Sequence, residues 1–204
     1  WVNDMLETNP RLWLPPIKEV HFFDIFPAPG KVSPKAGEHA RSRLRAWAKE
    51  PGWRSLPRSP HAGVRLHELA AMARFDVGLA LGRRDPSRYR RLFRPAIEKG
   101  KITGEITPAY SLLSLDQVQA LRAALRPDLK IFIVLRDPID RMWSHVTKDF
   151  HRMRGARPDE VSWKDALAFI EAEPCRARTR YAETLRTWFK VFGEERVMVA
   201  WFDE

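Results

Sequence analysis

LKIFIVLRDPIDRMWSH, residues 129–145, decides the fold, because an apolar run meets a polar turn within it. The run Leu129–Leu135 is almost continuously hydrophobic, which is typical of a parallel strand that a sheet buries on both faces. Pro138 then stands at the start of a helix that we expect over residues 139–153. A buried strand followed at once by a helix predicts a layered α/β fold.

The rest of the chain continues this alternation of helices and strands. We expect helices over residues 1–9, 36–49, 64–82, 86–99, 115–125, 163–172 and 176–192. Short strands are expected over residues 12–14, 17–24, 102–105 and 196–202. The 204 residues have the length of one ordinary domain. The pattern therefore predicts a single α/β domain with a central, mainly parallel sheet flanked by helices.

The polar turn after the apolar run is the first candidate site. Open parallel sheets bind ligands beyond the carboxyl ends of their strands, where a helix begins. Arg136 would project there, and Ser144 follows near the second turn of the helix. A guanidinium and a hydroxyl at a helix N-terminus suit a phosphate group. The same spacing is compatible with an ordinary ion pair between Arg136 and Asp137 or Asp140.

A second candidate lies in KEVHFFD, residues 18–24. On a strand, Glu19 and His21 would share one face, because they are two residues apart. A carboxylate and an imidazole bordered by Phe22 and Phe23 would make an acid/base pair in a partly dry pocket. The alternative is a surface strand with an ordinary ion pair.

The chain is strongly basic, with a formal net charge of +10 and 26 Arg against 10 Lys. This excess predicts an anionic partner, and the planar guanidinium matches phosphate or sulfate in two parallel bonds. A single cysteine, Cys175, excludes an internal disulfide framework. The six histidines have no zinc-like spacing, so no metal is expected. No apolar run approaches the ~20 residues that span a bilayer, which predicts a soluble protein.

Four segments follow one another along the chain: LPPIKEVHFFD, GEITPAY, KIFIVLRDPIDRMWSH and YAETLRTWFKVFGEERVMV. Together they resemble the sulfotransferases that use 3′-phosphoadenosine 5′-phosphosulfate (PAPS), above all the bacterial members and the heparan sulfate sulfotransferase branch. The similarity runs from Trp1 to Phe202, with a poorly matched insertion at about 30–84. It implies a P-loop-type three-layer domain, PAPS as co-substrate and 3′-phosphoadenosine 5′-phosphate (PAP) as product.

The resemblance also implies roles for individual residues in nucleotide binding. Arg136 and Ser144 correspond to the family's Arg and Ser that grip the 3′-phosphate. Trp1 resembles an aromatic residue that stacks on the adenine in some members. The family's 5′-phosphate loop would lie immediately upstream of Trp1, and its C-terminal cofactor loop has no counterpart after Glu204. The chain is therefore expected to lack both of these loops.

For catalysis, the resemblance implies that Glu19 is the general base, with His21 beside it. Asp24 would line the same pocket and bind the acceptor substrate. The acceptor would be a hydroxyl or an amine, with a glycan or another small molecule as the expected partner. Relatives with EKTPAY-like sequences carry a lysine where this chain has Ile106. The charge stabilisation that this lysine supplies would be missing here or come from another residue.

Two other functions remain as alternatives. A P-loop nucleotide kinase shares the layered architecture, and Asp137 would then be its Mg²⁺-binding carboxylate. A basic nucleic-acid-binding module is suggested by the clusters Arg88–Arg94 and Arg41–Arg45, but no helix-turn-helix, zinc-finger or RNP pattern occurs, so no nucleic-acid partner is expected. The Ala/Arg/Pro-rich composition and the lack of a visible signal peptide favour a bacterial, cytoplasmic protein.

Overall fold

The computed structural model describes residues 5–6, 8–15, 19–24, 41–42, 44–45, 62–81, 85–155 and 157–202. Its chain divides into two compact units. The first unit contains residues 1–110 and 123–125, and the second contains residues 111–122 and 126–204. Most of the insertion predicted at about 30–84 lies outside the described residues.

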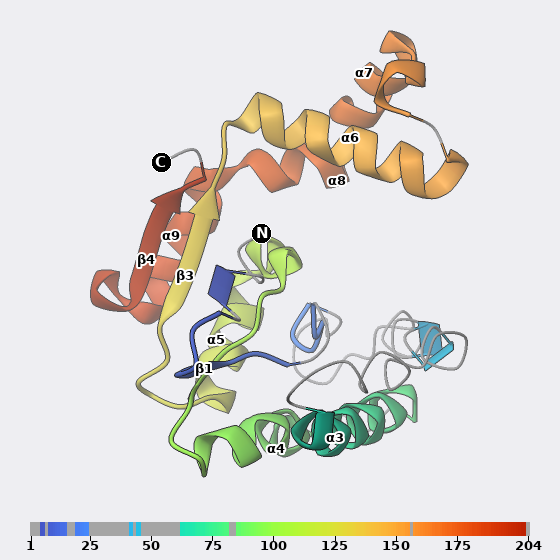
Figure 1. Ribbon diagram of the computed structural model, residues 1–204. Helices are drawn as coiled ribbons and strands as arrows, with labels where there is room; N and C mark the ends of the chain where they lie inside the picture. The colour runs from blue at the N-terminus through green and yellow to red at the C-terminus, as the bar shows by residue number, and fades with distance from the viewer. Residues whose placement is uncertain are drawn as a thin grey trace. The chain divides into compact units, whose positions relative to one another are not determined.

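The first unit combines a short parallel sheet with two helices (Figure 1). Strand β1 (Leu12–Trp13) pairs with β2 (Ile102–Thr103), and helix α3 (Ala62–Ala80) contacts α4 (Pro86–Ile97). Asp85 caps α4, because its carboxylate accepts the Ser87 N–H at 2.8 Å. This cap satisfies a backbone donor that no helical carbonyl can reach.

The core of the first unit is rich in aromatic residues. Phe22 lies with its ring centroid 4.9 Å from that of Phe23 and 5.1 Å from that of Tyr89. Tyr89 in turn packs on Phe93, with ring centroids 4.9 Å apart. Edge-to-face and tilted pairs at these distances add to the hydrophobic gain of burial. Packing against Tyr89 of α4 therefore holds Phe22 and Phe23 in the core of the first unit.

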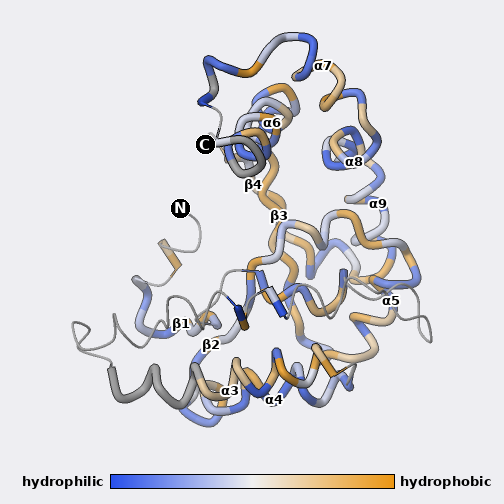
Figure 2. The backbone as a smooth tube through the Cα atoms, turned by 90° about the vertical axis from the view of Figure 1, so that its right-hand side faces the viewer, coloured by the Kyte–Doolittle hydropathy of each residue, from blue (hydrophilic) through white to orange (hydrophobic). Residues whose placement is uncertain are grey.

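The second unit is built on a parallel pair of longer strands. Strand β3 (Ile131–Leu135) pairs with β4 (Val197–Trp201), in register from Ile131 opposite Val197 to Leu135 opposite Trp201. Both strands are hydrophobic along their length (Figure 2). The other elements are η3 (Pro108–Leu112), α5 (Leu115–Ala124), α6 (Pro138–Arg154), η4 (Pro158–Glu160), α7 (Trp163–Glu171), α8 (Glu173–Arg176), η5 (Ala177–Thr179), α9 (Tyr181–Phe192) and η6 (Glu194–Arg196).

Helix α6 has well-defined ends and one buried face. Asp137 caps its start by accepting the N–H groups of Ile139 and Asp140, and Gly155 ends it with a left-handed φ of 66°. Val146 and Phe150 are buried against Ala166 of α7. The aspartate cap and the glycine end are the signals that typically bound a helix.

The structure confirms the mixture of helices and strands and the parallel pairing in both sheets. The strand expected over residues 17–24 is wrong where it is described, because residues 19–21 have no regular secondary structure and residues 22–24 form a bend. The single helix expected over 176–192 is also wrong. It is interrupted at Arg180, whose φ and ψ of −78° and 59° are not helical. A single three-layer domain built on one central sheet stays a prediction.

Within the part of the chain that the structure describes, no helix is both long enough and apolar enough to cross a bilayer.

Candidate active site

The segment Glu19–Asp24 brings three predicted site residues together. The Nε2 atom of His21 lies 3.0 Å from a carboxylate oxygen of Glu19, and its Nδ1 atom lies 2.6 Å from Asp24 Oδ2. The imidazole is largely enclosed, with its side chain 17% exposed. A carboxylate therefore contacts each ring nitrogen. The expected contact between Glu19 and His21 is observed, with Asp24 as a second partner of the imidazole, whereas the acid/base role of the pair stays a prediction.

The backbone that makes this cluster is unusual. Glu19 and His21 have φ angles of 59° and 54°, in the left-handed region that residues with a Cβ seldom adopt. Such a conformation costs about 1–2 kcal/mol per residue and persists only where surrounding contacts enforce it. The two side chains meet through this backbone conformation, not through the alternation of a strand. Strained non-glycine residues often mark functional sites.

The two carboxylates hold a proton on the imidazole. The hydrogen bond to Asp24 and then that to Glu19 raise the pKa of His21 from its ordinary 6.5 to about 9, although burial opposes the rise. At neutral pH His21 is therefore an imidazolium that donates to a carboxylate from each nitrogen.

Asp24 has spare capacity as a hydrogen-bond acceptor. Its Oδ2 atom contacts His21, whereas its buried Oδ1 atom has no hydrogen-bond partner among the described residues. A buried carboxylate oxygen without a donor is costly and calls for an explanation.

Glu105 is a feature of this site that the sequence pattern did not reveal. Its carboxylate accepts hydrogen bonds from the hydroxyls of Tyr89 at 2.5 Å, Thr107 at 2.8 Å and Tyr110 at 2.9 Å. Burial raises the pKa of Glu105, and the hydrogen bonds oppose that rise because they favour the charged form. The available signal was one charged residue in the otherwise uncharged GEITPAY segment.

Arg136 lies at the end of β3, as expected. Its Nη2 atom is 3.5 Å from Asp140 Oδ2. The guanidinium carbon lies 5.1 Å from the ring centroid of Phe202, so the guanidinium stacks on that ring. The Tyr181 hydroxyl donates to the Arg136 carbonyl at 2.8 Å, which fixes the strand end. The Arg136 Nε atom is buried and has no hydrogen-bond partner in the described part of the chain. The ion-pair alternative is thus observed, and the guanidinium still keeps donor capacity for an anion.

The remaining predicted binding residues are less informative. Ser144 is exposed on α6, and its carbonyl accepts the Thr147 hydroxyl at 3.3 Å. No hydrogen bond joins the side chains of Ser144 and Arg136 within the described ranges. Trp1 lies outside the described residues. Glu19, His21 and Asp24 belong to the first unit, whereas Arg136 and Ser144 belong to the second.

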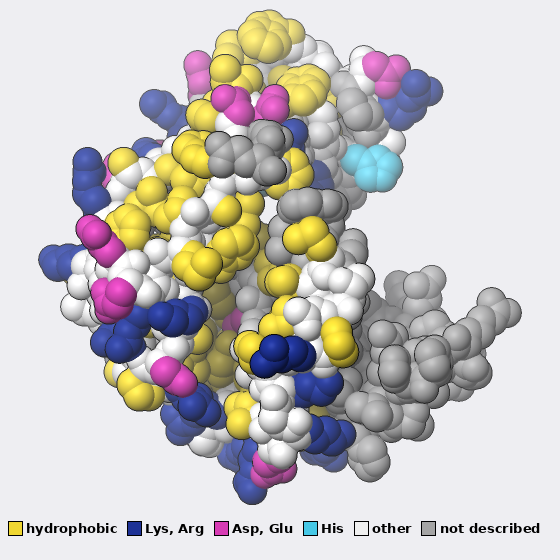
Figure 3. Space-filling model, turned by 60° about the vertical axis from the view of Figure 1, so that its left-hand side comes forward, with side chains coloured by type: hydrophobic (Ala, Val, Ile, Leu, Met, Phe, Trp, Pro, Cys, Tyr) yellow, Lys and Arg dark blue, Asp and Glu magenta, His cyan; other side chains and the backbone are white. Residues whose placement is uncertain are grey.

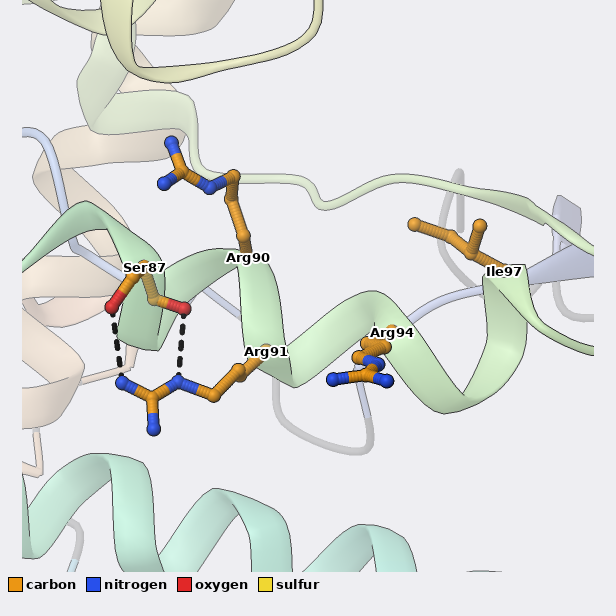
Figure 4. Close-up of a pocket in the computed structure, with 5 residues that line it drawn as sticks. All are labelled: Ser87, Arg90, Arg91, Arg94 and Ile97. Atoms are coloured by element: carbon orange, nitrogen blue, oxygen red, sulfur yellow. Dashed lines mark hydrogen bonds between the residues drawn. The ribbon is translucent and has the colours of Figure 1, made fainter.

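A pocket of about 450 Å³ lies along α4 and is lined by Ser87, Arg90, Arg91, Arg94 and Ile97 (Figure 4). Its arginines already have partners. Arg91 donates to Ser87, Arg94 to Glu98, and Arg90 to a main-chain carbonyl. This surface therefore offers less to a ligand than the Glu19–Asp24 segment.

Neither alternative function gains a site among the described residues. One carboxylate oxygen of Asp137 caps α6, and the described residues hold no group of three or more metal-binding side chains. On the face in Figure 3, basic side chains are interspersed with acidic and hydrophobic ones and do not form one continuous stripe. The described residues therefore give no support to a kinase metal site at Asp137. The face in Figure 3 gives none to a nucleic-acid-binding surface.

Comparison with known proteins gives one informative likeness. No family model matches the chain, and no curated protein matches it. A solved structure, the sulfotransferase from Alicyclobacillus acidocaldarius, is similar to it with a TM-score of 0.55 and 26% sequence identity. The likeness covers 99% of this chain and 67% of that chain. It supports the sulfotransferase family for this protein.

Proposed function

We propose that this protein is a PAPS-dependent sulfotransferase that moves a sulfuryl group to a hydroxyl or amine of an acceptor. The observation that carries the proposal is the likeness to a solved sulfotransferase over 99% of the chain. The Glu19–His21–Asp24 cluster supports it independently, because it contains a carboxylate suited to general-base catalysis. PAP would be the nucleotide product.

The nucleotide would bind at the carboxyl end of β3. Arg136 is the residue we assign to the 3′-phosphate, because its buried Nε atom has no hydrogen-bond partner among the described residues. A guanidinium binds a phosphate through charge-assisted hydrogen bonds. We assign Ser144 to the same phosphate and Trp1 to the adenine on the resemblance alone. PAPS would supply an activated sulfuryl group, and the residues of the chain would provide position and charge.

The proton chemistry would belong to the Glu19–Asp24 segment. Glu19 would accept the proton of the attacking hydroxyl or amine. His21, protonated at neutral pH, would orient the Glu19 carboxylate through the contact at 3.0 Å. Asp24 Oδ1 would accept a hydrogen bond from the acceptor and so fix its orientation. No metal takes part in this scheme.

The acceptor class follows from charge. A net charge of +10 favours an anionic molecule, and we propose a carbohydrate with acidic groups. Ile106 has no positive charge, so the charge stabilisation of the departing oxygen would be missing at this position or come from another residue. The bacterial, cytoplasmic location and the absence of a nucleic-acid partner stay predictions.

Nucleotide preference tests the proposal directly. Adenosine 3′,5′-bisphosphate, ADP and 5′-AMP would be compared in thermal-shift titrations, because a ligand that binds only the folded state raises Tm. We expect selective stabilisation by the bisphosphate. An equal shift with ADP would transfer support to the kinase alternative.

A sulfuryl-transfer assay tests the base. Glu19→Gln should lower turnover with radiolabelled PAPS and leave bisphosphate binding unchanged. Glu98→Gln is the matched control, because Glu98 is exposed on the surface and pairs with Arg94. An undiminished rate in Glu19→Gln would show that another group removes the proton.

A further inference from the structure

Two side chains of the GEITPAY segment, Glu105 and Tyr110, bind the main chain next to the candidate base. The Val20 N–H donates to the Glu105 carboxylate. The Tyr110 hydroxyl oxygen lies 3.1 Å from the Phe22 nitrogen and 3.4 Å from the Phe23 nitrogen. The main-chain N–H groups of Val20, Phe22 and Phe23 are thus hydrogen-bonded to side chains more than 80 residues away in the sequence.

The directions of these hydrogen bonds are fixed by elementary chemistry. The Tyr110 oxygen already receives two N–H groups, so its own proton points to the remaining partner, the Glu105 carboxylate at 2.9 Å. These donors approach the acceptor oxygens of Glu105, and their hydrogen bonds favour its ionised form against the effect of burial. A continuous chain of hydrogen bonds therefore runs from the main chain of Phe22 through Tyr110 to Glu105.

This chain of hydrogen bonds lies directly beside the strained backbone. Glu19 precedes Val20, and His21 lies between Val20 and Phe22, so both left-handed residues adjoin a tethered N–H group. Without such tethers, each would relax to a less costly conformation. Relaxation at either residue would turn its side chain away from the other and break the 3.0 Å contact.

We propose that Glu105 and Tyr110 are positioning residues: they hold residues 20–23 by main-chain hydrogen bonds and thereby keep Glu19 and His21 in contact. Their part in catalysis rests on the proposed function, whereas their hold on the segment does not. They touch neither the acceptor proton nor the nucleotide in this scheme. They act through the backbone that presents the base.

The pKa of His21 provides a measurement that does not depend on activity. It is set by Asp24 and Glu19, so it reports whether these contacts persist. NMR titration of the histidine ring protons would be carried out on the wild type and on Tyr110→Phe, Glu105→Gln and Tyr89→Phe. Tyr89→Phe is the matched control, because the Tyr89 hydroxyl also donates to Glu105 but binds no N–H group of the segment.

We expect a His21 pKa near 9 in the wild type and in Tyr89→Phe, and a fall of more than one pH unit toward 6.5 in the other two variants. Unchanged values in Tyr110→Phe would overturn the proposal. Equal falls in all three variants would overturn it too, because they would indicate general loosening. Should Glu105→Gln fail to fold, Tyr110→Phe decides alone, since it keeps the packed ring.

Turnover separates this inference from the proposed function. In an active enzyme, Tyr110→Phe should lower kcat about tenfold or more with the KM for the nucleotide unchanged, because misplacing a reacting group lowers the rate steeply. If the wild type transfers no sulfuryl group while the His21 pKa falls as expected, the proposed function fails and the positioning role stands. An unchanged kcat together with an unchanged His21 pKa refutes the positioning role.

Discussion

The protonated His21 should make folding stability depend on pH in a defined window. Its pKa is 6.5 when unfolded and about 9 when folded. A group with a raised folded pKa stabilises fully below the unfolded value, and its contribution is lost as pH rises through the folded value. At ~1.4 kcal/mol per pH unit, the contribution of His21 is about 3 kcal/mol at pH 6 and is lost between about pH 6.5 and 9.

The perturbation is His21→Gln, which keeps a polar side chain in place of the titrating ring. Urea denaturation followed by tryptophan fluorescence would give the free energy of unfolding from pH 6 to pH 9.5 by linear extrapolation. We expect the wild type to lose about 3 kcal/mol more than the variant across this range. Other groups titrate in both proteins, so the difference isolates His21.

Parallel curves for the two proteins would refute the reasoning. They would mean that the imidazole is not held between Glu19 and Asp24 in solution. A loss of stability in the wild type below pH 6.5, instead of above it, would equally contradict the raised pKa, because the sign would be opposite.

Three further predictions follow from the second unit. Arg136→Ala should weaken binding of adenosine 3′,5′-bisphosphate by ~1.5–3 kcal/mol, measured by calorimetry, the range for a hydrogen bond to a charged group; equal affinity would remove the 3′-phosphate assignment. Asp137→Ala should cost ~0.5–2 kcal/mol of stability in urea through loss of the α6 cap, and Asp137→Asn should cost much less; a Mg²⁺-dependent effect would favour the kinase. Val146→Ala, at a fully buried position, should cost about 2 kcal/mol, whereas Ile139→Ala, 72% exposed, should cost almost nothing; equal costs would contradict the packing of α6.

Much of the local structure was predictable because it depends on neighbouring residues. The apolar run before Arg136 predicted β3, and Pro138 predicted the start of α6, since a proline in the first turn of a helix acts locally. Ser114 lies directly before α5, and its hydroxyl accepts the Gln117 N–H at 3.3 Å. Local hydrogen bonds of this kind can be predicted from sequence spacing alone.

The segment Glu19–Asp24 was predicted only in part. Period-two spacing placed Glu19 beside His21, but on a strand that does not exist there. In the proposal above, the left-handed conformation of the two residues depends on hydrogen bonds that main-chain N–H groups of the segment donate to Glu105 and Tyr110, and no local pattern encodes these bonds. The intrinsic backbone preference of a residue does not decide its conformation where side chains distant in the sequence bind the neighbouring main chain.

The sequence by itself determined the hydrophobic strands β3 and β4, the start of α6 and the excess of basic side chains. These follow from periodicity, capping and charge, which act over a few residues. Only the tertiary structure decided that Glu105 and Tyr110 hold the backbone beside Glu19 and that His21 bridges two carboxylates. Folding brings these groups together across more than 80 residues, and burial then makes each hydrogen bond among them stronger than it would be in water.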